Sequence, residues 1–244
     1  MAQQNPVVLL TDVEAFIGPA LIRMFVARGA RVLAADPSFA EAGVASAYAA
    51  AHPGVTPVSQ TTPAETVARA LNHETAIDVL CTGGVHPANR TTAGDLSEDV
   101  TRPYFEKLVI EPLAYMSQLV EGMKARQYGR IVFVTSAGPV GGIPNFTAYA
   151  SARAALNGSV RSLAIELGAS GVSVNAVAPN YIETEAYFPQ ALISQPAVRS
   201  KILSRVPVRR FGEPGEAAAA VEFFALADAR FVTGQVLSVS GGWS

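Results

Sequence analysis

Near its N-terminus the chain reads Pro6-Val7-Val8-Leu9-Leu10-Thr11-Asp12-Val13-Glu14-Ala15-Phe16-Ile17-Gly18. The apolar run Val7–Leu10 predicts a buried strand, and the periodic pattern that follows the turn predicts a helix. Glycines at such a strand-to-helix turn let the backbone approach a phosphate group at the helix N-terminus. Only Gly18 remains of that glycine set, and Asp12 and Phe16 stand inside the turn. We therefore expect negative charge and aromatic bulk where a dinucleotide would otherwise bind.

The same division into short apolar runs and longer helical patterns continues along the chain. The runs are rich in Val, Ile and Leu without polar alternation, which is typical of parallel strands buried on both faces. They lie at Val7–Leu10, Val32–Ala35, Val55–Val58, Ile77–Cys81, Ile131–Val134, Val172–Val177 and Gln235–Val239, the run at 55–58 being the weakest. Helical patterns lie between them at Pro19–Arg28, Phe39–Ala51, Ala64–Asn72, Glu98–Arg126, Thr147–Leu167 and Pro214–Leu226. This alternation predicts an α/β fold with a parallel sheet, helices on both faces and right-handed crossovers.

The composition is that of a globular protein with a large core. Half of the 244 residues are hydrophobic and 16% are charged, which suits one α/β domain over residues 1–244. The net charge of −2 argues against a nucleic-acid partner, and no apolar run reaches the roughly 20 residues that span a bilayer. The N-terminus lacks the basic region of a signal peptide, and the single Cys81 fits a reducing compartment. We expect a cytoplasmic protein that binds neither nucleic acid nor membrane.

Four segments that follow predicted strands are expected to meet in space. In sheets of this kind, ligands bind beyond the carboxyl ends of the strands. One crevice should therefore bring together Thr11–Gly18, Cys81–Asn89, Ser136–Phe146 and Ala178–Phe188. The stretch 180–207 is predicted to be irregular, as lids and binding loops are.

Several motifs together resemble the short-chain dehydrogenase/reductase superfamily. They are Arg130-Ile131-Val132-Phe133-Val134-Thr135-Ser136, Tyr149-Ala150-Ser151-Ala152-Arg153, Val174-Asn175-Ala176-Val177-Ala178-Pro179, Phe231-Val232-Thr233-Gly234-Gln235-Val236 and Gly241-Gly242-Trp243. The likeness extends over nearly the whole chain. It implies a doubly wound, Rossmann-like sheet of seven parallel strands flanked by helices on both faces, and a homotetramer.

The chain departs from that superfamily at positions that serve the nicotinamide cofactor. The glycine fingerprint is lost at Asp12 and Phe16, and the Asn-Asn-Ala-Gly segment after the fourth strand reads Cys81-Thr82-Gly83-Gly84. The lysine four residues after the tyrosine is Arg153, and Ile110-Glu111-Pro112 stands where the long helix should carry an asparagine. Because the serine and the tyrosine persist while these positions change, we expect an acid–base site without a cofactor.

This combination is similar to that of the halohydrin dehalogenases, a branch of the superfamily that uses no cofactor. Their catalytic set is Ser, twelve residues, Tyr, three residues and Arg, and Ser136, Tyr149 and Arg153 match it. The resemblance implies conversion of vicinal haloalcohols to epoxides with release of halide. In reverse it implies epoxide opening by small anions such as azide, cyanide or nitrite. An aromatic-rich segment, Tyr187-Phe188-Pro189, also fits the family, and the implied halide site consists of Phe16, Pro179, Asn180, Tyr181, Ile182 and Phe188.

The residue types at 136, 149 and 153 suit this chemistry. Tyr149 and Arg153 are four residues apart, so they share one helix face, and a guanidinium lowers the pKa of a nearby tyrosine. The phenolate can accept a proton from a substrate hydroxyl, while Ser136 hydrogen-bonds the same oxygen. The alkoxide then displaces halide from the adjacent carbon, in an intramolecular step that depends on positioning.

The two ends of the pocket are predicted from the flanking segments. The halide would be held by backbone N–H groups of Asn180 and Tyr181 and by the aromatic edges of Phe16 and Phe188, which carry partial positive charge. The substrate side would be lined by His86, Pro87, Gly138 and Ile143, and the modest size of residues 138 and 143 predicts a roomy pocket. Trp243, close to the C-terminus, could reach the site of a neighbouring subunit. Three scattered His and one Cys give no metal-ligand spacing, so no metal is expected.

Two other functions stay open on the sequence alone. One is an NAD(P)-dependent short-chain reductase with an unusual turn, which Asp12, Phe16 and Arg153 oppose. The other is a non-catalytic relative that kept the fold as a binding module, which the intact serine, tyrosine and arginine oppose. Asp36 follows the second strand, where a dinucleotide enzyme binds a ribose hydroxyl. Without the glycine turn we interpret it as a relic or a cap.

Overall fold

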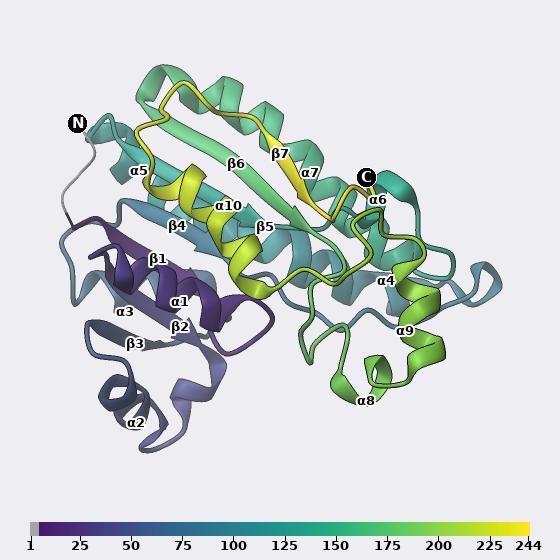
Figure 1. The fold of residues 1–244 in the computed structure, drawn as a ribbon. Helices are drawn as coiled ribbons and strands as arrows, with labels where there is room; N and C mark the ends of the chain where they lie inside the picture. Colours follow the sequence, from purple (N-terminus) through teal and green to yellow (C-terminus); the bar gives the residue numbers. More distant parts are fainter. Residues whose placement is uncertain (1–4) are drawn as a thin grey trace.

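Seven parallel strands form one sheet in the order β3-β2-β1-β4-β5-β6-β7 (Figure 1). The computed structural model describes residues 5–244. The strands are β1 Val7–Thr11, β2 Arg31–Asp36, β3 Val55–Ser59, β4 Val79–Thr82, β5 Gly129–Val134, β6 Val172–Pro179 and β7 Val236–Val239. The direction of winding reverses between β1 and β4, which places the crevice at the carboxyl ends of the strands. The predicted doubly wound, seven-stranded parallel sheet is confirmed, including the weak strand β3.

Helices cover both faces of the sheet. They are α1 Gly18–Ala27, α2 Val44–Ala51, α3 Pro63–Leu71, α4 Glu98–Phe105, α5 Glu111–Ala125, α6 Gly138–Gly141, α7 Thr147–Leu167, α8 Gln190–Ile193, α9 Pro196–Leu203 and α10 Pro214–Leu226, with 3-10 turns η1 Pro37–Ala40, η2 Ala93–Asp95 and η4 Gly168–Ser170. Helices α1 and α10 pack on one face, and α3, α5 and α7 pack on the other (Figure 1). Within residues 5–244, no helix combines the length and apolarity that a membrane span needs.

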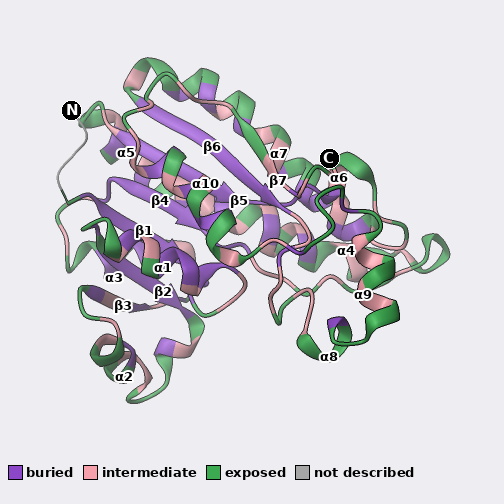
Figure 2. Ribbon diagram, in the orientation of Figure 1, coloured by how far each residue is buried: buried purple, intermediate pink, exposed green. Residues whose placement is uncertain are grey.

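Each central strand sends alternate side chains into two separate cores. In β1, Val8 and Leu10 pack with α1 and α10, whereas Val7 and Leu9 pack with α5 and α7. Figure 2 shows the central strands buried along their length and the outer helix faces exposed. This burial on both faces is the reason why the sequence shows continuous apolar runs and no alternation.

The long helix predicted over 98–126 changes its winding in the middle. A π-helical segment, η3 Glu106–Ile110, lies between α4 and α5. The Glu111 amide donates to the Glu106 carbonyl, five residues back, and Pro112 has no N–H for the usual bond to the carbonyl four residues back. The wider turn accommodates this missing donor.

The helix predicted over Phe39–Ala51 is wrong in its first half. Asp36 Oδ1 accepts hydrogen bonds from the Ser38 amide at 3.0 Å and the Ser38 hydroxyl at 2.8 Å, which start the turn η1. Gly43, with a φ of +82°, then redirects the chain before α2 begins. Asp36 Oδ2 also accepts from the Glu14 amide at 3.0 Å. The interpretation of Asp36 as a cap is therefore confirmed.

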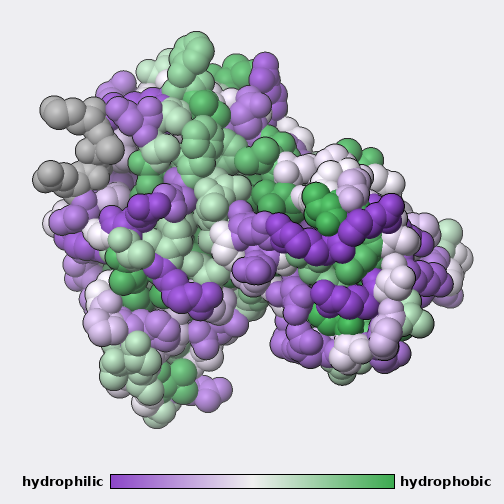
Figure 3. Space-filling view, viewed as in Figure 1, coloured by the Kyte–Doolittle hydropathy of each residue, from purple (hydrophilic) through white to green (hydrophobic). Residues whose placement is uncertain are grey.

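The stretch 180–207 contains more regular structure than predicted. Two short helices, α8 and α9, form a lobe beyond the carboxyl ends of the strands (Figure 1). Figure 3 shows mostly hydrophilic residues on the outside of this lobe. The prediction of an entirely irregular loop is wrong: Pro196 starts α9 at a position that proline favours, and Pro189 directly precedes α8. The single turn α6 was likewise absent from the predicted elements.

Gly83 lies where β4 ends against the turn that follows β1. A Cβ atom at Gly83 would lie 2.5 Å from the Thr11 carbonyl oxygen and 2.8 Å from the Asp12 Cβ. Gly83→Ala should therefore lower the free energy of unfolding by about 1–3 kcal/mol, the usual cost of overpacking. Gly94→Ala is the matched control, because a Cβ there meets no atom closer than 3.9 Å. Urea unfolding measures both variants, and equal stabilities would contradict the close packing of these two turns.

Candidate active site

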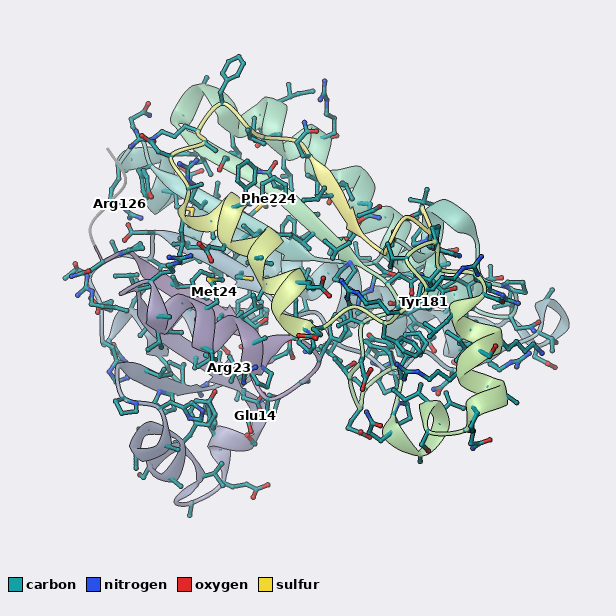
Figure 4. All side chains as sticks on the ribbon, viewed as in Figure 1. Glu14, Arg23, Met24, Arg126, Tyr181 and Phe224 are labelled. Atoms are coloured by element: carbon teal, nitrogen blue, oxygen red, sulfur yellow. The ribbon has the colours of Figure 1, made fainter. Side chains whose placement is uncertain are left out.

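A cavity of about 390 Å³ opens beyond the carboxyl ends of β5 and β6, with α9 along one wall. The predicted residues that line it are Phe16, Ser136, Ile143, Tyr149, Arg153, Pro179, Asn180, Tyr181, Ile182 and Phe188. Figure 4 shows the labelled Tyr181 in this crowded region beside α9. The structure thus brings the predicted catalytic and halide residues together in one place.

Ser136 and Tyr149 reach the cavity from two different elements. Ser136 follows β5, and its Oγ accepts a hydrogen bond from the Gly138 amide at 3.0 Å. Tyr149 lies in the first turn of α7, close enough to Ser136 for the serine to favour the ionised form of the tyrosine. Further along α7, Asn157 Nδ2 donates to the Ser136 carbonyl at 3.2 Å. Strand end and helix are thereby tied together, and the serine hydroxyl is held beside the tyrosine.

Arg153 lies one turn after Tyr149 on α7 and is almost entirely buried, with 1% of its surface exposed. Its Nη2 donates to the Gly84 carbonyl at 2.7 Å, and its Nη1 donates to the Val134 carbonyl at 3.1 Å. Its guanidinium carbon lies 5.3 Å from the centre of the Tyr149 ring. A buried cation is stable only with such acceptors, so these two carbonyls hold the charge against the tyrosine.

Arg153 lies beside two buried tyrosines, Tyr149 and Tyr187, whose pKa values shift in opposite directions. Burial alone would raise the pKa of Tyr149, but the guanidinium and hydrogen bonds from Ser136, Arg153 and Tyr187 outweigh it and hold the pKa below its usual value of 10.0. Burial, reinforced by the neighbouring Tyr149, raises the pKa of Tyr187. Tyr149 is therefore the member of this pair that loses its proton first.

Tyr187 is a cavity residue missing from the predicted site. Its hydroxyl lies 3.5 Å from Arg153 Nη2 and donates to the His86 carbonyl at 3.3 Å. Its ring meets Phe16 edge-on, with 5.1 Å between the ring centres. The aromatic pair Tyr187-Phe188 is the available sequence signal, but it does not reveal which ring faces the arginine.

The turn after β6 offers fewer amide donors than predicted. The Asn180 amide donates to the Val239 carbonyl at 3.0 Å and so continues the pairing with β7. The Tyr181 amide lies 2.9 Å from the Asn180 side-chain oxygen, and Tyr181 takes a left-handed φ of +55°. Among residues 5–244, the Ile182 amide has no acceptor. The prediction that the Asn180 amide faces an anion is therefore wrong, because the sheet already uses it.

His86 and Pro87 do not line the cavity in the part of the chain that the structure describes. The His86 ring packs edge-on against Tyr104 of α4 at 4.9 Å between centres, and burial lowers the pKa of this histidine. The Asn89 amide donates to the Tyr104 hydroxyl at 2.9 Å. The loop after β4 thus folds onto α4, so the placement of residues 86 and 87 on the substrate side is wrong. Ala88 is the residue of this loop that reaches the cavity wall.

Gly138 lies behind Ser136 and does not line the cavity, whereas Ile143 does. A Cβ at Gly138 would come within 2.9 Å of the Ile143 side chain and 3.1 Å of Ser136 Oγ. The absence of a side chain therefore lets the Ile143 side chain and the serine pack together. Gly138 holds the serine through its amide, so its placement on the cavity wall is wrong, whereas the roomy substrate side stays a prediction.

Wall residues also come from α9, which no motif marks, and from the C-terminal Gly241-Gly242-Trp243 motif. Trp243 meets Tyr181 edge-on with 5.5 Å between ring centres, and a Cβ at Gly141 would lie 2.6 Å from the indole. The structure places Trp243 at the cavity wall of its own chain, and its reach to the site of a neighbouring subunit stays a prediction. Lys201 and Arg205 line the same cavity.

The turn between β1 and α1 does not fit a dinucleotide. Phosphate binding at a helix N-terminus requires free backbone N–H groups. Most amides of this turn donate to acceptors inside the protein, and they belong to Asp12, Val13, Glu14, Ala15 and Gly18. The Phe16 side chain occupies the cavity side of the turn. Within residues 5–244, no group of three His, Cys, Asp or Glu side chains is placed to hold a metal ion.

Asp12 anchors a partly buried charged network at this turn. Its Oδ1 lies 3.0 Å from Lys107 Nζ, and Lys107 Nζ lies 2.7 Å from Glu111 Oε1. Gln60 Nε2 donates to Asp12 at 3.2 Å and to Glu111 at 3.3 Å. Burial favours the neutral amine of Lys107, but the two carboxylates hold its pKa above the usual value. Burial raises the pKa of Glu111.

Gly84 connects this network to the buried arginine. Its amide donates to Asp12 Oδ2 at 3.1 Å, and its carbonyl accepts from Arg153 Nη2 at 2.7 Å. Gly84 has a φ of +53°, in the left-handed region that glycine tolerates best. Because Gly84 makes both hydrogen bonds, Asp12 helps to fix the Gly84 carbonyl that binds the Arg153 guanidinium.

Comparison with known proteins agrees with this fold. The family model for enoyl-(acyl carrier protein) reductases matches residues 14–244. The 3-oxoacyl-[acyl-carrier-protein] reductase FabG of Vibrio harveyi is 33% identical over 249 residues, which cover 99% of this chain and 98% of that protein. The chain therefore belongs to this reductase family, within the short-chain dehydrogenase/reductase superfamily.

Two solved structures are similar over the full fold and carry a different chemistry in their names. One, described as a dehalogenation enzyme, is 38% identical with a TM-score of 0.95 and covers 100% of both chains. The other is the halohydrin dehalogenase HheC bound to ethyl (2S)-oxiran-2-ylacetate. It is 27% identical with a TM-score of 0.92, and the match covers 97% of this chain and 96% of that one. Relatives thus include reductases and dehalogenases, and the cavity residues have to discriminate between them.

Arg153→Met removes the positive charge and should raise the pKa of Tyr149, because burial then acts without the guanidinium. Arg153→Lys is the matched control, since it keeps a cation and should hold the pKa below that of the Met variant. Ultraviolet difference titration of tyrosine ionisation measures the shift, and Tyr149→Phe identifies the transition that belongs to this residue. Identical titrations of the protein and of Arg153→Met would contradict the coupling of the two side chains.

Lys107→Met leaves the carboxylates of Asp12 and Glu111 close together without the ammonium. The free energy of unfolding should fall by about 3 kcal/mol, the lower end for breaking a buried ion pair, because 24% of the Lys107 side chain is exposed. Lys124→Met removes an exposed pair with Glu121 and should cost less than about 1 kcal/mol. Chemical denaturation of the two variants measures the difference, and equal losses would show that the Asp12 network contributes no more than a surface pair.

Proposed function

We propose that this chain is a cofactor-independent halohydrin dehalogenase, which converts vicinal haloalcohols to epoxides and halide. The observation that carries the proposal is the buried Arg153, which lowers the pKa of Tyr149 at the wall of the cavity. The turn where a dinucleotide would bind has most of its amides engaged. A deprotonated tyrosine here would therefore act as a general base on the substrate, with no nicotinamide beside it. The similarity to two solved structures that are named for dehalogenation supports the same choice.

The reaction begins with the substrate hydroxyl between Ser136 and Tyr149. The serine hydroxyl, held by the Gly138 amide, donates to the substrate oxygen, and the Tyr149 phenolate takes the substrate proton. An electron pair of that oxygen forms a bond to the adjacent carbon while the carbon–halogen bond breaks, and halide leaves with the bonding pair. Arg153 compensates the phenolate before proton transfer. Because the attack is intramolecular, positioning supplies much of the rate.

The leaving halide is received between Phe16 and the turn after β6. The edges of Phe16 and Phe188 carry partial positive charge, and the Ile182 amide lacks an acceptor among residues 5–244. In the described chain, no Asp or Glu side chain lines the cavity, so no fixed carboxylate repels the anion. The same surroundings suit azide, cyanide or nitrite as they enter to open an epoxide in the reverse direction.

An NAD(P)-dependent reductase is the second candidate, because curated relatives at about one-third identity over the whole chain are named as reductases. The engaged amides of the turn and the Asp12 carboxylate oppose it. The homotetramer and the cytoplasmic location stay predictions.

The purified protein should release chloride from 1,3-dichloro-2-propanol with no nicotinamide present. Tyr149→Phe should lower the rate by about 10²–10⁴-fold, the usual contribution of a general base. Tyr115→Phe, which removes a buried hydroxyl outside the cavity, is the matched control and should retain the rate. In the parent, kcat/KM should fall as the pH drops below the pKa of Tyr149, because only the phenolate accepts the proton.

Two results would contradict the proposal. No chloride release together with tight NADPH binding would make the chain a reductase. No release and no NADPH binding would favour a non-catalytic member of the superfamily.

A further inference from the structure

We propose that Lys201 and Arg205 form a second anion subsite at the rim of the cavity, which takes a carboxylate group of the substrate. The inference rests on the proposed dehalogenation and names its substrate class as haloalcohols and epoxides that carry a carboxylate. Lys201 belongs to α9, and Arg205 follows four residues later, just after the helix ends. Both side chains line the cavity, and both residues are exposed to solvent.

The fixed charges around the cavity all have one sign. Among its described lining residues, the charged side chains are those of Arg153, Lys201 and Arg205, and no carboxylate balances them. The charge of Arg153 is already matched by two carbonyls and by Tyr149. The two rim cations are therefore left to attract an anion, in a concave site where the field is stronger than on an open surface.

The second cation of α9, Arg199, is paired with a carboxylate, whereas Lys201 and Arg205 are not within the described chain. Arg199 forms an ion pair with Glu183 at 3.9 Å. Within residues 5–244, neither Lys201 nor Arg205 has an acidic partner closer than 4.0 Å. Arg205 lies near the hydroxyl of Tyr181, a wall residue of the cavity, and its positive charge opposes the rise that burial causes in the pKa of that tyrosine. Since Arg205 lines the cavity and makes no ion pair with the residues that the structure describes, its guanidinium N–H groups are donors that a ligand there can use.

A carboxylate suits this pair better than a halide does. An ammonium and a guanidinium match carboxylate oxygens through charge-assisted hydrogen bonds. The predicted halide side offers different groups, namely the ring edges of Phe16 and Phe188 and the buried Ile182 amide. The cavity of about 390 Å³ has room for a small substrate whose reacting carbons lie at Tyr149 and whose acid group extends to the rim.

The test compares 4-chloro-3-hydroxybutanoate with its ethyl ester, which has the same reacting atoms and no charge. The readout is the ratio of kcat/KM for acid and ester, measured by chloride release. The double variant Lys201→Gln/Arg205→Gln should lower this ratio about tenfold, because it removes two charge-assisted contacts at a partly exposed site. Arg199→Gln, on the same helix but already paired with Glu183, is the matched control and should keep the parent ratio.

Two kinetic outcomes would overturn the inference. One is an unchanged ratio, including an equal loss for acid and ester. The other is an increase in the KM for azide when the double variant opens a neutral epoxide, with the ratio unchanged. That result would assign the rim cations to the small entering anion and not to the substrate.

A binding measurement separates this inference from the proposed function. Calorimetry with 3-hydroxybutanoate, which has no halogen to release, needs no turnover. Binding should be about tenfold weaker in the double variant than in the protein and in Arg199→Gln. Equal binding by the parent, the double variant and Arg199→Gln would overturn the subsite even if dehalogenation is found. Weaker binding by the double variant alone would support the subsite even if dehalogenation is not found.

Discussion

The buried guanidinium of Arg153 is the charge on which the arrangement of the site depends. With 1% of its surface exposed, it is stable only where acceptors and an opposing charge surround it. The acceptors are the carbonyls of Gly84 and Val134, and the opposing charge is available from Tyr149. These groups come from the loop after β4, from β5 and from α7, so one charge fixes three elements. The lowered pKa of Tyr149 follows from the same requirement, because the phenolate and the guanidinium stabilise each other.

The turn after β1 supports this charge from the far side of Gly84. Asp12 and Phe16 have φ values of +54° and +52°, a conformation that costs a non-glycine residue about 1–2 kcal/mol. Hydrogen bonds from Gly84 and Lys107 to the Asp12 carboxylate offset that cost. The backbone thus keeps the shape of a glycine turn while its donors are satisfied within the protein. The same residue, Asp12, therefore fills the turn and, through Gly84, helps to hold Arg153.

Local spacing explains which parts of this site the sequence reveals. Burial on both faces produces the continuous apolar runs that predicted all seven strands, and a four-residue helical separation placed Tyr149 and Arg153 on one face. The errors fall where a distant segment decides the outcome. Asn180 loses its amide to β7, and the loop carrying His86 folds onto α4. The ion pair of Asp12 joins residues 95 positions apart, and no periodicity or motif reports such a pair.

A reaction that starts from a phenolate and ends with a free halide needs a cavity without fixed negative charge. Asp12 is the carboxylate that could disturb it, but its oxygens are directed to Gly84, Gln60 and Lys107, and it does not line the cavity. The Asp12 carboxylate is paired with Lys107, so a dinucleotide would meet a turn whose amides are mostly engaged and whose cavity side holds Phe16. Asp12 therefore engages the turn from within and, through Gly84, helps to hold the cation that lowers the pKa of Tyr149.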